Sequence, residues 1–114
     1  MLLAIDVGNT NAVFALHDGE DWVAMWRSAT DARRTADDYI VWLEPLMNMR
    51  KVSSYDIDAC VISCVVPQAL FNFRNLARRY FATEPLVVGE PSVELGVPIR
   101  IPRPEQVGAD RLVS

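Results

Sequence analysis

Apolar residues at the start of the chain fall in a pattern that predicts two strands joined by a tight turn. The first run, residues 2–5 followed by Val7, is typical of a buried strand that begins at the N-terminus. Gly8 and Asn9 then turn the chain. Beyond the turn, apolar residues recur at every second position: Ala12, Phe14 and Leu16. Asp6 interrupts the first run, so the pattern predicts a hairpin with a carboxylate at its mouth.

The next segment predicts a third antiparallel strand. A polar stretch that contains one glycine, residues 17–21, forms the turn before it. Alternation predicts the two faces of this strand: Trp22, Ala24 and Trp26 on one, Val23 and Met25 on the other. His17 is the only histidine, and it has no serine or cysteine partner nearby in the sequence. We therefore expect it to be a solvated residue at the strand end.

A helix is predicted after the polar loop of residues 28–34. Thr35 suits its N-cap, and two acidic residues in the first turn complement the helix dipole. Apolar residues then recur at helical spacing: Tyr39, Ile40, Leu43, Leu46 and Met47. Pro45 lies inside this pattern, so we expect the helix to kink or end near Glu44.

The second half of the chain predicts a strand, a helix and another strand. Residues 58–66 are almost continuously apolar, which favours burial on both faces in the parallel part of a sheet. Pro67 follows at a natural first helical position. The predicted inward positions of this helix are Leu70, Phe73 or Phe71, Ala77 and Tyr80. Residues 85–89 predict a short buried strand, residues 97–101 an extended piece, and residues 107–114 the first turns of a helix.

Composition limits the class of protein. The chain has 114 residues, of which 51% are hydrophobic, and its formal net charge is −4. This length suits one core, and the acidic balance argues against a nucleic-acid partner. With no apolar stretch long enough for a bilayer and no signal-peptide features, we expect no membrane association and a location in the cytoplasm. Cys60 and Cys64 share one predicted strand, so we expect small buried thiols and neither a disulfide nor a zinc site.

The first hairpin carries the residues that could bind a phosphate and a metal ion. Backbone amides of Gly8, Asn9 and Thr10 could face phosphate oxygens, while Asp6 could hold the metal, through water. The alternative is a strand-end aspartate that caps a turn. Arg33 and Arg34 could also reach a phosphate, although a solvated loop is the favoured interpretation.

A second group of candidate residues closes the chain. Gly108 and Ala109 expose backbone amides, Asp110 offers a carboxylate, and Arg111 offers a forked cation. The alternative is an acidic residue in the first turn of a helix with an incidental arginine beside it. By itself, that alternative is favoured for this group.

Taken together, these features resemble a known fold and a known family. The order of elements resembles the ribonuclease H-like domain of the actin, Hsp70 and sugar-kinase superfamily, an α/β fold whose mixed sheet has three antiparallel strands, then parallel strands, with flanking helices. Five motifs, in this order and spacing, resemble type III pantothenate kinase: Asp6-Val-Gly-Asn-Thr10, Arg34-Thr-Ala-Asp37, Val61-Ile-Ser-Cys-Val-Val-Pro67, Pro85-Leu-Val-Val-Gly89 and Gly108-Ala-Asp-Arg111.

The resemblance implies ATP-dependent phosphorylation of pantothenate, the first step of coenzyme A synthesis. It implies that the ATP phosphates are lined by the first hairpin: Asp6, Val7, Gly8, Asn9, Thr10, Asn11, Ala12 and Val13. Asp6 would hold Mg²⁺. It also implies that pantothenate is bound by the closing motif: Gly108, Ala109, Asp110 and Arg111. Asp110 resembles the base that accepts the proton of the pantothenate hydroxyl, a role that suits phosphoryl transfer to an alcohol.

The sequence departs from the family pattern in two ways. Many members have a tyrosine that contacts pantothenate before the closing motif, whereas residues 99–103 here contain none. The family also has a second domain of similar fold, which supplies a K⁺ or NH₄⁺ site, much of the adenine pocket and most of the homodimer interface. Residues 1–114 correspond to the first domain alone. We therefore expect this chain by itself to be a half-enzyme without turnover, with apolar surface left uncovered.

Two other classes of function remain open. Relatives of this family have been described as accessory factors acting on gene expression, so a chain with half of the ATP cleft could serve as a non-catalytic binding protein. A phosphate-hydrolysing relative on the same fold is disfavoured, because the closing motif suits an organic acceptor better than water.

Overall fold

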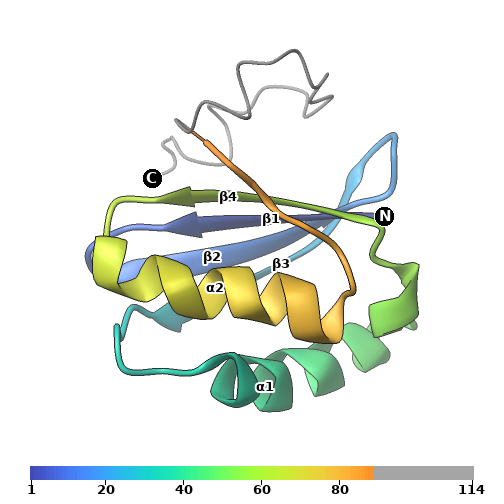
Figure 1. Cartoon of the computed structure of the whole chain (residues 1–114). Helices are drawn as coiled ribbons and strands as arrows, with labels where there is room; N and C mark the ends of the chain where they lie inside the picture. The colour runs from blue at the N-terminus through green and yellow to red at the C-terminus, as the bar shows by residue number, and fades with distance from the viewer. Residues whose placement is uncertain (89–114) are drawn as a thin grey trace.

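The computed structural model describes residues 1–88, which form a five-stranded sheet with two helices packed on one face (Figure 1). The strands are β1 (Leu2–Val7), β2 (Asn11–His17), β3 (Trp22–Ala29), β4 (Ala59–Cys64) and β5 (Leu86–Val87). The helices are α1 (Ala36–Met49) and α2 (Pro67–Tyr80), with a short 3-10 helix at Ser54–Asp56. The elements predicted at residues 97–101 and 107–114, and the last residue of the strand predicted at 85–89, lie outside the described residues.

The sheet is mixed, as the sequence predicts. Its strand order is β3-β2-β1-β4-β5. The pairs β1–β2 and β2–β3 are antiparallel, whereas β1–β4 and β4–β5 are parallel. Three antiparallel strands followed by parallel ones confirm the ribonuclease H-like sheet. The first strand is therefore the central one. The turn of the hairpin that it begins lies at the end of the central strands.

The main core lies between the sheet and the two helices. Strand alternation directs Leu3, Ile5 and Val7 to this side, and the helices cover them. Phe14 of β2 packs against the rings of Tyr39 and Phe73, with centroids 5.8 and 5.9 Å away. These aromatic contacts hold the helices against the central strands, which carry the first turn at their end.

Helix α1 begins as predicted and ends later than predicted. The Thr35 hydroxyl accepts a hydrogen bond from the Asp38 amide, and the Asp38 carboxylate accepts one from the Thr35 amide, which completes a capping box. Of the two predicted alternatives, an end near Glu44 is wrong, because the helix runs through Pro45 to Met49, and a kink there stays a prediction. Pro45 lies on the exposed face, where water can hydrate the backbone carbonyl that the missing N–H leaves without a helical partner.

The start of β3 differs from simple alternation. Register shifts between Leu16 and His17, which is the mark of a β-bulge. Val23 consequently packs against the main core, while Trp22 joins a small cluster on the opposite face. The predicted grouping of Trp22 with Ala24 and Trp26 is therefore wrong, since one extra residue moves a side chain to the other face.

His17 is also not solvated. It is 4% exposed, and its ring lies 4.7 Å from the Trp22 ring in an edge-on arrangement. Its Nδ1 accepts a hydrogen bond from the Gly19 amide at 3.1 Å. Its Nε2 has no partner among the described residues. The Trp22 ring covers this strand-end residue, which the sequence pattern did not indicate.

Helix α2 begins at Pro67 as predicted, and its inward aromatic residue is Phe73. Phe73 is fully buried, whereas Phe71 is 69% exposed, which decides between the two alternatives. The two helices are tied at their ends: the Tyr80 hydroxyl donates to the Asp37 carboxylate, and Arg79 lies 3.6 Å from the same group. Both cysteines are free thiols, as expected. Within the described part of the chain, neither helix has the length and apolar character needed to cross a bilayer.

Candidate functional site

Asp6 lies next to the end of the central strand, on the face of the sheet that the helices do not cover. Its neighbours in β1, Ile5 and Val7, point into the main core, so Asp6 points the other way. Its register partners are Val13 on β2 and Ser63 on β4. The residue is partly exposed. A carboxylate at this position, one residue before the end of β1, can meet a ligand that binds at the turn.

The turn after β1 presents backbone to the surface. Asn9, Thr10 and Asn11 are exposed. The Gly8 amide donates a hydrogen bond to the Asn11 carbonyl at 2.9 Å and is therefore already used inside the turn. Of the three amides that the sequence suggested for a phosphate, those of Asn9 and Thr10 remain as the better donors. This arrangement resembles the backbone concavities that bind anions in other proteins.

Gly8 is not required by the backbone conformation of the turn. Its φ is outside the left-handed region. A Cβ added there would meet the Asn11 carbonyl oxygen at 3.4 Å, which is an ordinary contact. Neither strain nor crowding inside the described chain therefore demands glycine. Glycine does leave the backbone of the turn uncovered, so an outside group can approach it closely.

The last two residues of the predicted phosphate site face opposite sides of the sheet. Ala12 is fully buried in the main core, so its side chain is unavailable and only its backbone could contact a ligand. Val13 pairs with Asp6 across the β1–β2 ladder and shares its face. The structure thus gathers Asp6, the exposed turn and Val13 at one place.

Thr30, in the segment after β3, supports the turn through two hydrogen bonds that the sequence pattern does not predict. The Thr30 hydroxyl donates a hydrogen bond to the Gly8 carbonyl at 2.7 Å, and the Thr30 amide donates one to the Thr10 carbonyl at 2.9 Å. Neither periodicity nor a local motif could reveal a contact between residues 22 positions apart. The available signal was a threonine in a polar stretch, which is weak.

The two arginines of the following loop differ. Arg33 is exposed and pairs with Asp31 at 3.2 Å, which lowers the pKa of that carboxyl through hydrogen bonds from the Arg33 backbone and side chain. This confirms the solvated interpretation for Arg33. Arg34 is partly buried: its guanidinium donates to the Ser28 hydroxyl at 2.5 Å and lies 5.9 Å from the centre of the Tyr39 ring. The sequence did not indicate these contacts.

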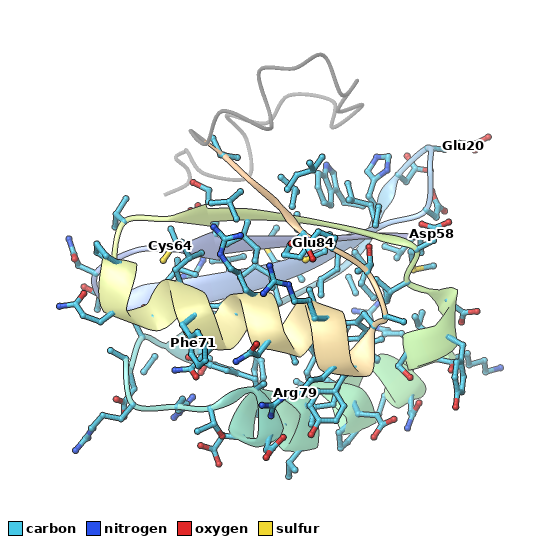
Figure 2. All side chains as sticks on the ribbon, in the orientation of Figure 1. Glu20, Asp58, Cys64, Phe71, Arg79 and Glu84 are labelled. Carbon is cyan, nitrogen blue, oxygen red and sulfur yellow. The ribbon has the colours of Figure 1, made fainter. Side chains whose placement is uncertain are left out.

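Cys64 lies at the same end of the sheet as the turn. Its Cα is paired with that of Val7, and Figure 2 shows it at the end of β4, far from Glu20 and Asp58 at the opposite end. Partial burial raises the pKa of its thiol, and the charge of Asp6 adds to this effect. The thiol donates to the Val66 carbonyl at 3.1 Å. A raised pKa disfavours the thiolate, the form of cysteine that acts as a nucleophile.

The closing motif cannot be placed. Gly108, Ala109, Asp110 and Arg111 lie outside the described residues. Their predicted roles in pantothenate binding and base catalysis stay predictions.

The donor set around Asp6 suits a magnesium ion carried by a phosphate better than a protein-built metal centre. Within residues 1–88 there is no group of three or more histidine, cysteine or carboxylate side chains that could hold a metal. Magnesium commonly binds through one or two carboxylates, with waters and phosphate oxygens completing its octahedron. One carboxylate beside exposed amides fits that pattern.

Comparisons with known proteins identify the family of the chain. The sequence model for type III pantothenate kinase matches residues 2–114. Type III pantothenate kinases from Maricaulis maris, Hyphomonas neptunium and Phenylobacterium zucineum are 63%, 61% and 60% identical over all 114 residues. The match covers 44%, 45% and 44% of those proteins, so the chain spans less than half of their length.

A solved structure supports the fold alone. YeaZ from Pseudomonas aeruginosa superposes with a TM-score of 0.56 at 15% identity, covering 96% of this chain and 49% of that one. At this identity the similarity says nothing about activity. The family match over nearly the whole chain is more specific, and it shows that the chain belongs to the type III pantothenate kinase family.

Proposed function

We propose that the protein containing this chain transfers a phosphoryl group from ATP to the hydroxyl of pantothenate, the first step of coenzyme A synthesis. The observation that carries the proposal is the exposed Gly8–Asn11 turn beside Asp6, in a chain of this family. Because the chain spans about 44% of its relative from Maricaulis maris, the activity of the whole protein is part of the proposal.

The turn would bind the ATP phosphates through backbone amides. Asn9 and Thr10 are exposed in the turn between β1 and β2, and Gly8 leaves room for phosphate oxygens to approach their amides. The Asp6 carboxylate would hold Mg²⁺ through water. When bound, that ion would neutralise negative charge on the phosphate oxygens. The residues of the turn fix the phosphates in one orientation, which is the main requirement of phosphoryl transfer.

The closing motif would bind the acceptor. Gly108, Ala109 and Arg111 would hold pantothenate, and Asp110 would accept the proton of its hydroxyl as the bond to phosphorus forms. A carboxylate of ordinary pKa can serve because the proton leaves late in a loose transition state. A second domain with a site for K⁺ or NH₄⁺, homodimer formation and a location in the cytoplasm belong to the same proposal.

The test is a product assay on the complete polypeptide that contains residues 1–114. The protein is incubated with ATP, Mg²⁺ and K⁺, with or without pantothenate, and ADP and phosphopantothenate are measured together. We expect ADP release to depend on pantothenate and to match phosphopantothenate formation one to one. Equal ADP release without pantothenate would indicate a phosphate-hydrolysing enzyme. No ADP release in either sample would favour a non-catalytic binding protein.

A further inference from the structure

Thr30 is connected to both ends of the turn after β1. Its hydroxyl donates to the Gly8 carbonyl at 2.7 Å, and its amide donates to the Thr10 carbonyl at 2.9 Å. The side chain is partly buried, which protects the hydroxyl bond from exchange with water. The segment that follows β3 therefore clamps the turn from outside the hairpin.

The clamp determines where the amides of the turn point. All peptide bonds of the described residues are trans, so each carbonyl and the amide of the next residue point in opposite directions. Holding the Gly8 carbonyl toward Thr30 turns the Asn9 amide away from Thr30. Holding the Thr10 carbonyl in the same way turns the Asn11 amide away. Two peptide planes of an exposed turn are thus fixed by one residue.

The two bonds have different requirements. Any residue other than proline at position 30 has an amide that can continue the β2–β3 ladder to Thr10. The bond to Gly8 needs a side-chain hydroxyl, which only serine, threonine or tyrosine has, and tyrosine is too long for this contact. The hydroxyl is therefore not needed to form the strand. Its specific effect is on the Gly8–Asn9 peptide plane.

We propose that Thr30 is a positioning residue, whose hydroxyl holds the Gly8–Asn9 peptide in the orientation that receives nucleotide phosphates. The inference rests on the proposed function of the turn. A fixed peptide plane reduces the ordering cost of binding, because the amide already points where the phosphate oxygen arrives. Without the hydroxyl bond, the Gly8 carbonyl can rotate toward water and take the Asn9 amide with it.

The test compares three variants of the complete polypeptide. Thr30→Val keeps the shape and removes the hydroxyl, whereas Thr30→Ser keeps the hydroxyl. Thr35→Val is the matched control, because it removes a threonine hydroxyl from the cap of α1 and does not touch the turn. Affinity for Mg·ADP is measured by titration calorimetry, and thermal stability is measured on the same samples.

We expect Thr30→Val to weaken Mg·ADP binding about tenfold, the usual scale for one lost hydrogen bond in a preorganised site. Thr30→Ser should bind within about twofold of the wild type, because it restores the same donor. Thr35→Val should lose thermal stability and keep its affinity. In steady-state kinetics, Thr30→Val should raise KM for ATP and leave KM for pantothenate unchanged.

Two results would overturn the inference: Mg·ADP binding by Thr30→Val equal to that of the wild type, or an equal loss of affinity in Thr35→Val. If Thr30→Val does not fold, Thr30→Ala replaces it with the same expectations. The proposed function fails separately. A wild-type protein that binds Mg·ADP and forms no phosphopantothenate overturns the kinase proposal alone, and a wild-type protein that binds no Mg·ADP overturns both.

Discussion

At the scale of single residues, the position of Asp6 carries most of the functional argument. It occupies a central strand between Val13 and Ser63, where an apolar residue would pack at lower cost. The neighbouring residues of β1 show that alternative, since Ile5 and Val7 are almost completely buried. A carboxylate at this position lies beside the exposed turn, on the face of the sheet that the helices leave open, and in the proposed function it would hold a phosphate-bound Mg²⁺.

Replacing Asp6 by Asn should therefore remove catalysis and leave the fold. We expect turnover to fall about a hundredfold or more, the scale seen when a group that stabilises developing charge is removed. Thermal unfolding should change little, because asparagine has nearly the same shape. The matched control is Asp21→Asn in the exposed turn between β2 and β3, beside Glu20 at the opposite end of the sheet (Figure 2). Near-normal turnover in Asp6→Asn would return this residue to the role of a turn cap.

Asp110 should behave differently, as the base that acts on pantothenate. Its contact with the hydroxyl proton matters mainly in the transition state, so Asp110→Asn should lower kcat far more than it raises KM for pantothenate. A fall of about a hundredfold in kcat is expected for a lost general base. Steady-state kinetics with varied pantothenate measure both values. A higher KM at unchanged kcat would make Asp110 a binding residue only.

The two cysteines should react slowly in the folded protein. Burial raises the pKa of the Cys60 thiol from 9.0 to about 12, and partial burial raises the pKa of Cys64. Few thiolates are then present at pH 8, so iodoacetamide should modify the native protein much more slowly than the denatured protein. Since the folded pKa of Cys60 lies above the unfolded one, its contribution to stability should be complete below about pH 9 and be lost as the pH rises toward 12. Rapid labelling of Cys60 at pH 8 would contradict this burial.

At the scale of elements, periodicity predicted the number and type of strands and helices in residues 1–88, and chain geometry explains where it failed. Nearly continuous apolar runs predicted β1 and β4, alternation predicted β2, and helical spacing after Pro67 predicted α2. Such a pattern cannot show where a bulge adds an extra residue to a strand. The extra residue of β3 opposite Leu16 and His17 therefore placed Trp22 on the other face, where its ring contacts the buried His17.

The candidate site was predictable only where a local motif marks it. The turn after β1 contains its own signal, namely glycine and asparagine after a strand that ends with a carboxylate. The clamp from Thr30 depends on how β3 pairs with β2, which is a tertiary fact. Likewise, the use of the Gly8 amide inside the turn depends on the conformation of the turn, which residue types alone do not determine.

Helix α1 offers a test of the local rule that failed. Pro45 is exposed and its helix continues through it, so the proline removes a hydrogen bond without a packing benefit in the described structure. We expect Pro45→Ala to stabilise the protein by roughly 1–2 kcal/mol, since alanine is the better helix former and the entropy of the unfolded chain offsets part of the gain. Thermal or chemical unfolding measures this. A destabilised variant would show that Pro45 contributes to packing in the folded protein.

At the scale of the whole molecule, fold and family carry different information. The likeness to YeaZ at 15% identity extends over 96% of this chain, which shows how widely the sheet is shared. The relatives near 60% identity match over all 114 residues, and this match shows the family as well as the fold. The proposed activity therefore rests on the turn after β1 and on the closing motif, and not on the fold.

The most direct test is a crystal structure of the complete polypeptide with Mg²⁺, a non-hydrolysable ATP analogue and pantothenate. We predict phosphate oxygens within hydrogen-bond distance of the Asn9 and Thr10 amides, the metal linked to Asp6 through water, and the pantothenate hydroxyl on the Asp110 carboxylate. Asp6 and Asp110 would then line the same active site, with Asp6 on the metal side and Asp110 on the pantothenate side. Phosphates bound away from the turn, or Asp110 on the opposite side of the sheet from Asp6, would contradict the account.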